Sequence, residues 1–339
     1  MSVGQAASAI PPASRVGSAT GPSREMLRFA MHARLPTSEA PAAACRVTTH
    51  ALAAAPLSEI QRVRDQPVPE GAPSLPSRFL RHCDEQTVVG MRAVLTAIAA
   101  AAEPRPSYAD YAVVAGACRA GRIATARSLS MYRTGGAVTV SPHIVPQCSL
   151  HSLAGAVSVA LGMHGPHVGS SGGPHAVSEG LLAAFSLAAA GGHGRDPLPG
   201  IWLVLTGWTK EPALDREGQP LASADAEEEP VCRALAMALV PIHGVDDPAA
   251  TVRGPVLALH PTPPTVRHGA APPPVATELV ALDGALTRLR GTPGVDQSGA
   301  AAWSHVCPWA MELRLTVAGG LGLADPRQRP VTPLRKEAA

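Results

Sequence analysis

The segment from Ser141 to Trp208 constrains the fold more than any other part of the sequence. A helical run there leads into a short turn of Gly and Ser at residues 169–173, which opens into an almost wholly apolar helix. The apolar run Ile201–Thr206 follows and is typical of a strand buried on both faces. A helix that begins directly after such a turn offers free backbone N–H groups and the positive end of its dipole. The sequence therefore places any chemistry at this turn.

Hydrophobic periodicity elsewhere predicts an α/β fold with a mixed sheet and a buried central helix. Apolar runs bounded by turn residues predict strands over Met26–His32, Tyr111–Ala117, Val168–Gly169, Ile201–Thr206, Val231–Val240, Gly254–Leu259 and Met311–Val317. Helical spacing predicts helices over Leu57–Arg64, Pro76–Ala102, Gly121–Arg133, Pro146–Gly162, His175–Ala190 and Ala276–Arg290. Strands alternate with helices through the middle of the chain and become antiparallel afterwards, with Val231–Val240 and Gly254–Leu259 as a candidate pair.

Composition and charge exclude several classes of partner. The chain has 35 Pro, 32 Gly and only 3% aromatic residues, so we expect a core of small side chains with loose ends. A formal net charge of +2, from 28 basic and 26 acidic residues, gives no electrostatic case for nucleic acid. No apolar run is long enough for a membrane span, and no targeting segment stands out. We therefore expect neither nucleic acid nor a membrane as partner.

The cysteine pattern predicts a reducing, cytoplasmic setting. The six cysteines show no CxxC pair and no regular spacing, so neither a disulfide framework nor a zinc ribbon is expected. Most lie in apolar runs and are interpreted as small buried hydrophobes. The turn sequence His164–His167 with His175 lacks the carboxylates or thiols that would complete a coordination shell, so no metal is expected. The glycines at 169–173 lack a following Lys-Ser/Thr, so no nucleotide cofactor is expected either.

The turn itself contains two candidate nucleophiles. Residues 169–173 formally match G-x-S-x-G, with Ser171, or its neighbour Ser170, as nucleophile and a nearby histidine such as His151 or His175 as base. The glycines Gly169, Gly172 and Gly173 would then shape an oxyanion or acyl-binding turn. The favoured alternative is that the turn caps the following helix, with Ser171 hydrogen-bonded at the N-terminus.

A second candidate pair lies in the preceding helix. Cys148 and His151 are three positions apart and would share one face of the expected helix, where they could form a thiolate–imidazole pair. The alternative, which we favour, is a buried cysteine beside a structural or interface histidine.

Several local sequences occur in an order and spacing that match a known family. They are Leu75–Arg81 (LPSRFLR), Val113–Arg122 (VVAGACRAGR), Ser141-Pro142 with Cys148–Ser152 (CSLHS) and Ala154-Gly155, Ala160–Gly162 (ALG) with Gly165-Pro166, and Gly172–Gly180 (GGPHAVSEG). These segments resemble β-ketoacyl synthases, which are thiolase-fold enzymes, and more closely the short ketosynthase-like family of aryl-polyene and related polyketide-type gene clusters. The resemblance covers about residues 26–245. It implies a thiolase-like layered half-fold.

The chain also differs from that family in the residues that would carry out catalysis. True synthases carry a cysteine nucleophile at the start of the buried helix, whereas this turn has Ser170 and Ser171 and no cysteine. The two catalytic histidine motifs of the synthase C-terminal half are not found downstream. The resemblance therefore implies a pseudoenzyme without Claisen chemistry of its own, which binds an acyl chain, an acyl carrier protein or a full ketosynthase. A homodimer is left open.

Two alternatives to that function remain open. One is a serine-dependent acyltransferase or thioesterase that uses the turn, and the other is a purely structural homo-oligomer.

The resemblance and the composition together divide the chain into four parts. We expect a disordered N-terminal tail at 1–25, a ketosynthase N-terminal-like domain at 26–245, an extension with a Pro-rich linker at 246–324, and a mobile tail at 325–339. Whether the extension completes the sheet or forms an appendage is left open by the sequence.

Overall fold

The computed structural model describes residues 41–142, 144–170, 173–190, 197–221, 229–243, 254–262, 273–291, 301–307 and 311–317. The strand expected at Met26–His32 and the two expected tails lie outside these residues.

A single mixed sheet runs through the described residues in the order β3-β2-β4-β5-β1-β6-β8-β7. Its strands are β1 (Ala43–Pro56), β2 (Ala112–Ala117), β3 (His167–Ser170), β4 (Ile201–Trp208), β5 (Val231–Ile242), β6 (Pro255–Pro261), β7 (Trp303–Cys307) and β8 (Met311–Val317). The neighbours β3, β2 and β4 are parallel, and every other pairing is antiparallel. The expected α/β class with a mixed sheet is therefore confirmed.

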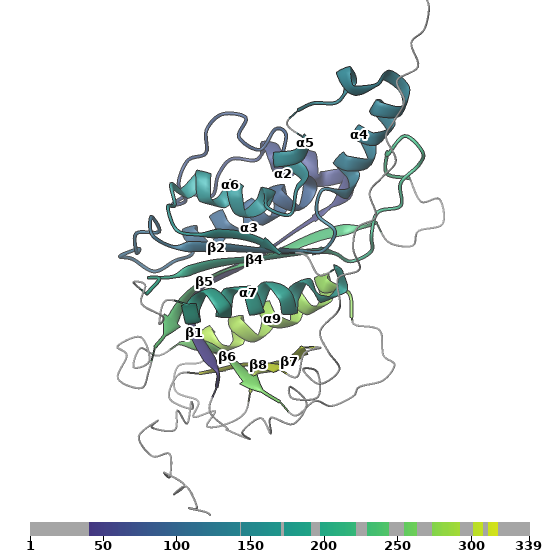
Figure 1. Ribbon diagram of the computed structural model, residues 1–339. Helices are drawn as coiled ribbons and strands as arrows, with labels where there is room; N and C mark the ends of the chain where they lie inside the picture. The colour runs from purple at the N-terminus through teal and green to yellow at the C-terminus, as the bar shows by residue number, and fades with distance from the viewer. Residues whose placement is uncertain are drawn as a thin grey trace, which may run out of the picture. The chain divides into compact units, whose positions relative to one another are not determined.

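Helices cover the two faces of this sheet as separate layers. The described helices are η1 (Leu57–Glu59), α2 (Ile60–Asp65), α3 (Glu85–Ala99), α4 (Arg122–Gly135), η2 (Ala137–Thr139), α5 (Ile144–Cys148), α6 (Ser152–Leu161), η3 (Gly173–His175), α7 (Ala176–Ala190) and α9 (Val275–Gly291). Figure 1 shows α3 and α6 on one side of β2 and β4, and α7 with α9 on the other, between these strands and β6 and β8. Among the described helices, none combines the length and apolar character needed to cross a bilayer.

The alternation of side chains along β4 divides the core in two. Leu203 and Leu205 pack in the cluster with α7 and α9, where Leu181 and Leu279 are fully buried. Trp202 points the other way, into the cluster that contains α3 and α6. Every residue of β4 is buried, as expected for a strand covered on both faces.

The middle of the sheet is built by a strand that the sequence did not indicate. Residues 43–56 belong to none of the strands or helices expected from the sequence, yet β1 pairs with β5 on one side and β6 on the other. The expected β5–β6 pair is therefore wrong, because β1 lies between them. Alanine has low strand propensity, so burial and pairing, rather than local preference, decide the conformation here.

The helix α3 begins later than the pattern predicts. Helix was expected from Pro76, but the structure has turns up to Cys83 and α3 starts at Glu85. Two features explain the difference. Arg78 has φ of 64°, which is incompatible with a right-handed helix. The Asp84 carboxylate accepts a hydrogen bond from the backbone N–H of Thr87, which is the N-cap arrangement.

The C-terminal segment completes the sheet. Beyond residue 245, β6, β8 and β7 extend it, and α9 packs beside α7 in the same core cluster. The expected helix at Ala276–Arg290 and strand at Met311–Val317 are confirmed, whereas β7 was not expected.

The buried helix α7 lies very close to β2 and β4. A Cβ atom added to Gly180 would lie 2.5 Å from a methyl carbon of Leu205 and 3.3 Å from the Cα atom of Gly116. A Cβ added to Gly116 would lie 2.9 Å from the carbonyl oxygen of Ala176. Side chains larger than hydrogen are thus excluded at this crossing, and the start of α7 is held against β2.

Candidate functional site at the start of α7

The structure has the expected order of strand, turn and helix at residues 167–190. β3 ends at Ser170, η3 follows at Gly173–His175, and α7 begins at Ala176. Ser171 and Gly172, the centre of the predicted turn, lie outside the described residues. Only glycine fits at position 169, because a Cβ atom there would lie 2.1 Å from the carbonyl oxygen of Leu150. Gly173 has φ of 55°, in the left-handed region that glycine favours.

Two of the predicted site residues have other partners. Ser170 donates a hydrogen bond from its Oγ to the carbonyl oxygen of Ala115, 3.4 Å away. His151 precedes α6, and its Nε2 lies 2.6 Å from Nδ1 of His167 on β3. This pair connects the start of α6 to β3.

The predicted Cys148–His151 pair does not share a helix face. α5 ends at Cys148, and α6 begins only at Ser152, with His151 at its N-cap. Burial, together with the carboxylates of Asp84 and Glu85, raises the pKa of Cys148 to about 12. The thiol is therefore protonated at neutral pH and is a poor nucleophile.

A hydroxyl, an imidazole and a carboxyl group meet at the first turn of α7. The Oγ atom of Ser178, the third residue of α7, lies 2.7 Å from Nε2 of His305 on β7. On the other side of the ring, Nδ1 of His305 lies 3.4 Å from Oε1 of Glu278 on α9. Three elements from distant parts of the chain thus build one cluster, which we call the Ser178 cluster (Ser178, Glu278 and His305).

Burial dominates the electrostatics of this cluster. Ser178 is 1% exposed. Burial raises the pKa of Glu278 to about 7, and burial followed by the charge of His175 lowers the pKa of His305. An ion pair alone would shift both pKa values the opposite way, so desolvation outweighs the attraction. The ring of His305 is therefore neutral at neutral pH and can accept a proton at Nε2 when Nδ1 carries the hydrogen.

A thiol and a second imidazole stand beside the same cluster. Burial raises the pKa of the Cys307 thiol, a shift that its hydrogen bond with Ser178 opposes. His175 in η3 is close enough to His305 for its charge to lower that histidine's pKa. The sequence showed no downstream histidine motif that would reach the start of α7, yet His305 is brought there by a strand that was not expected.

The contacts within the Ser178 cluster indicate which reaction it could catalyse. A hydroxyl bonded to an imidazole, whose other nitrogen faces a carboxyl group, is the arrangement that activates serine nucleophiles. The first turn of an α-helix adds backbone N–H groups without intrahelical acceptors, which can stabilise an oxyanion.

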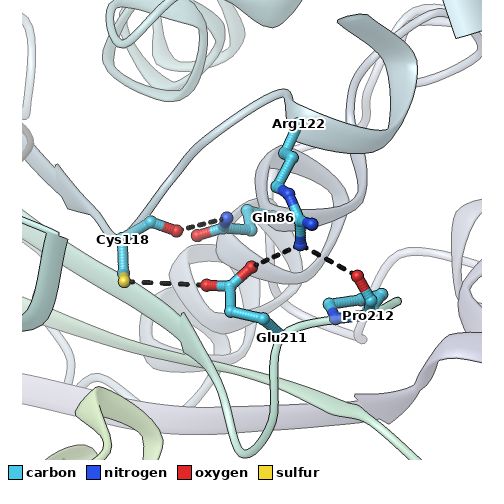
Figure 2. Close-up of polar contacts among 5 residues, drawn as sticks. All are labelled: Gln86, Cys118, Arg122, Glu211 and Pro212. Atoms are coloured by element: carbon cyan, nitrogen blue, oxygen red, sulfur yellow. Dashed lines mark hydrogen bonds and ion pairs between the residues drawn. The ribbon is translucent and has the colours of Figure 1, made fainter. Parts of the chain in front are cut away.

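A second polar cluster lies where β2 and β4 end, and Figure 2 shows its members. Glu211 accepts from an Arg122 guanidinium nitrogen at 3.3 Å, and the same nitrogen donates to the carbonyl oxygen of Pro212 at 2.8 Å. The Cys118 thiol lies 3.8 Å from Oε1 of Glu211, and Gln86 donates to the Cys118 carbonyl oxygen at 2.8 Å. Burial and Glu211 raise the pKa of Cys118 to about 11, so this cluster anchors the loops and holds no reactive thiolate.

Two surface grooves lie away from the Ser178 cluster. One of about 690 Å³ is lined by α2, α3 and the turns at 75–81, and one of about 650 Å³ lies between α2 and residues 210–221. Neither groove is lined by a member of the Ser178 cluster. Within the described ranges, no three His, Cys, Asp or Glu side chains are grouped so as to hold a metal.

No family model and no curated protein matches this chain. Among solved structures, it is similar to a type II polyketide synthase acyl-carrier protein in complex with its ketosynthase bound to the hexaketide. That match has a TM-score of 0.38 and 13% identity and covers 58% of this chain and 62% of the other. A β-ketoacyl synthase from Burkholderia phymatum STM815 matches with a TM-score of 0.38 and 14% identity, covering 59% of each chain.

The ishigamide ketosynthase/chain length factor is also similar, with a TM-score of 0.39, 14% identity and 73% of each chain covered. The chain spans about three fifths of the length of the first two structures. All three are of the class that the sequence motifs resemble.

Proposed function

We propose that this chain is a β-ketoacyl synthase-like subunit of fatty-acid or polyketide-type biosynthesis, which binds an acyl carrier protein or a full ketosynthase and lacks Claisen condensation activity. The observation that carries the proposal is at the start of α7. The sequence from Gly169 through the first turn of α7 contains no cysteine, whereas the synthases that the motifs resemble need a thiolate at the start of this helix. The nearby thiol of Cys307 is 4% exposed, and burial raises its pKa.

Exposed apolar side chains support the binding part of the proposal. On α4 and η2, Leu129 is 59% exposed, Tyr132 56% and Val138 95%. The same helix carries the exposed arginines Arg127 and Arg133. Apolar side chains beside arginines fit a protein partner that presents apolar residues next to carboxylates.

The edge of the sheet supports pairing with a second chain. In the part of the chain that the structure describes, β3 pairs with β2 alone, and His167 and Val168 are exposed. An open edge strand is a template for another strand, in a homodimer or in a complex with a synthase. A reducing, cytoplasmic setting is part of the proposal, and all six cysteines are free.

The test combines a binding assay with a condensation assay on the full chain. We expect saturable binding to a carrier protein or ketosynthase, and no β-ketoacyl product when acyl and malonyl carrier proteins are supplied. Leu129→Asp and Tyr132→Asp should each weaken binding by about tenfold or more. Val159→Asp, at an apolar position that is 70% exposed on α6, is the matched control and should bind normally.

Two outcomes would contradict the proposal. A β-ketoacyl product above the protein-free background overturns the missing Claisen activity. Failure to bind any carrier protein or ketosynthase overturns the binding role.

A further inference from the structure

We propose that Ser178, His305 and Glu278 form a serine acylation site that accepts the acyl group of a thioester. This activity goes beyond the binding role proposed above and does not depend on it. It also uses a different serine from Ser170 and Ser171 of the predicted turn.

The geometry of the nucleophile and base is already in place. The Oγ atom of Ser178 lies 2.7 Å from Nε2 of His305, within the range needed for general-base catalysis. The ring of Trp303 stacks on the ring of His305, with a centroid distance of 5.7 Å and an interplanar angle of 4°, and so restricts rotation of the imidazole. The imidazole is therefore fixed on two sides, and its orientation toward Ser178 is preorganised.

Glu278 is the positioning residue. Its Oε1 lies 3.4 Å from Nδ1 of His305, a contact that favours the tautomer with hydrogen on Nδ1 and leaves Nε2 free to accept the serine proton. An ionised Glu278 also stabilises the imidazolium that forms when the proton is transferred.

Solvent reaches the cluster from the side of the imidazole. Ser178 itself is 1% exposed, but the side chains of His305 and Glu278 keep 16% and 10% of their surface. Among the described strands, β7 is the outermost on its side of the sheet, so His305 lies at an edge and not in the middle of the core. A thioester carbonyl would approach along this edge.

The reaction balances without a cofactor. The Ser178 Oγ attacks the carbonyl carbon while its proton moves to Nε2 of His305, and the positive end of the α7 dipole favours the negative charge that develops on the carbonyl oxygen. The carbon–sulfur bond then breaks, and the leaving thiolate takes the proton from Nε2. The products are an ester on Ser178 and a free thiol. Water, activated by the same nitrogen, can later hydrolyse the ester to a carboxylic acid.

The pH dependence distinguishes this role from a purely structural one. His305 is the base and Glu278 must be ionised, so acylation should rise with pH through about 7, where Glu278 titrates. Among the described residues, the other titratable groups that face the cluster are His175 and Cys307. Glu278→Gln should lower the acylation rate and remove the rise near pH 7, whereas loss of a structural contact alone would leave the shape of the profile unchanged.

The experiment uses the full chain and hexanoyl-N-acetylcysteamine as the acyl donor, read by intact mass and peptide mapping. We expect one hexanoyl adduct on Ser178, none on Ser178→Ala, and a rate about 10²–10⁴-fold lower for His305→Gln. Ser186→Ala, at an exposed serine of the same helix, is the matched control and should be acylated like wild type. Ser178→Cys should recover the adduct as a thioester, and thermal melting should show that all variants are folded.

Several results would overturn the inference. They are no adduct on folded wild type between pH 6 and 9, an adduct that persists in Ser178→Ala, or an adduct mapped to Cys307. If acylation fails while carrier-protein binding is retained, this inference alone is wrong. If binding fails while Ser178 is acylated, the proposed binding role alone is wrong.

Discussion

The Oδ2 atom of Asp84 accepts a hydrogen bond from the backbone N–H of Gly121, 2.8 Å away and 37 residues later in the chain. The other carboxylate oxygen accepts from the backbone N–H of Thr87 at 3.0 Å. Asp84 is 3% exposed and thus caps α3 and holds the loop between β2 and α4 at once. A buried carboxylate with backbone donors on both oxygens makes this junction rigid.

Replacing Asp84 by Ala should lower the free energy of unfolding by about 2–4 kcal/mol, because two buried N–H groups lose their acceptor. Urea denaturation monitored by circular dichroism measures the change. Asp110→Ala, at an exposed position in a turn, is the control and should stay within about 0.5 kcal/mol of wild type. An unchanged midpoint for Asp84→Ala would contradict the role of this carboxylate.

Two helix glycines should respond in opposite ways to the same substitution. In α7, a Cβ at Gly180 would lie 2.5 Å from Leu205 and 3.3 Å from Gly116, so Gly180→Ala should destabilise by about 1–3 kcal/mol despite the better helix propensity. In α6, the nearest atom to a Cβ at Gly155 is 3.8 Å away, on His151. Gly155→Ala should therefore be neutral or stabilise by up to about 1 kcal/mol. Thermal melting of both variants checks the pair, and equal shifts would be inconsistent with tight packing of α7 on β2.

The elements that the sequence predicted correctly have strong local signals. The apolar run that became β4 and the helix that became α7 are both continuous and bounded by turn residues. β1 was missed because its alanines resemble a loop until β5 and β6 pair with it. β7 was missed because it is short, and its sequence Trp-Ser-His-Val-Cys has neither a continuous apolar run nor a regular polar–apolar alternation.

The sequence predicted where the candidate site lies but not which residues form it. The glycines before α7 mark the start of the helix. The hydrogen bond between Ser178 and His305, however, joins residues 127 positions apart, so no local sequence pattern could predict it. Two weak signals existed: a glutamate in the first turn of the helix at 275–291, and a histidine in the short run at 303–307. Only the packing of α9 against α7 turns these signals into one cluster.

A buried histidine should make stability depend on pH. Burial, followed by the charge of Arg290, lowers the pKa of His50 to about 4, from 6.5 in an unfolded chain. Between pH 6.5 and 4 the unfolded state therefore binds the extra proton, and the stability that the neutral ring provides is lost as the pH falls.

The measurement compares the unfolding free energy of wild type and His50→Gln from pH 8 to pH 4, which separates His50 from the other titrating groups. The difference at pH 8 gives the part that does not depend on protonation. Between pH 8 and pH 4, the unfolding free energy of wild type should fall by roughly 1–3 kcal/mol more than that of His50→Gln. A difference that stays constant over this range would show that His50 does not titrate as expected.

The cysteines should react slowly until the protein unfolds. Burial is the largest cause of a raised pKa at Cys45, Cys83, Cys118 and Cys148, each at about 11 or 12, and burial also raises the pKa of Cys232 and Cys307. The thiolate is the reactive form, so iodoacetamide at pH 7 should modify each thiol at least about tenfold more slowly than free cysteine. If a cysteine of the folded protein reacted as fast as free cysteine, it would again be a candidate for the nucleophile of a condensation reaction.

Removing the charge beside Cys118 tests the cause of this protection. Glu211 raises the pKa of Cys118 both through its charge and through its hydrogen bond with the thiol. Glu211→Gln removes the negative charge, so the pKa should fall and alkylation of Cys118 at pH 8 should accelerate several-fold. Glu217→Gln, at an exposed position in the same loop, is the matched control and should leave the rate unchanged. Equal rates in wild type and Glu211→Gln, with Cys118 identified by peptide mapping, would mean that burial alone protects this thiol.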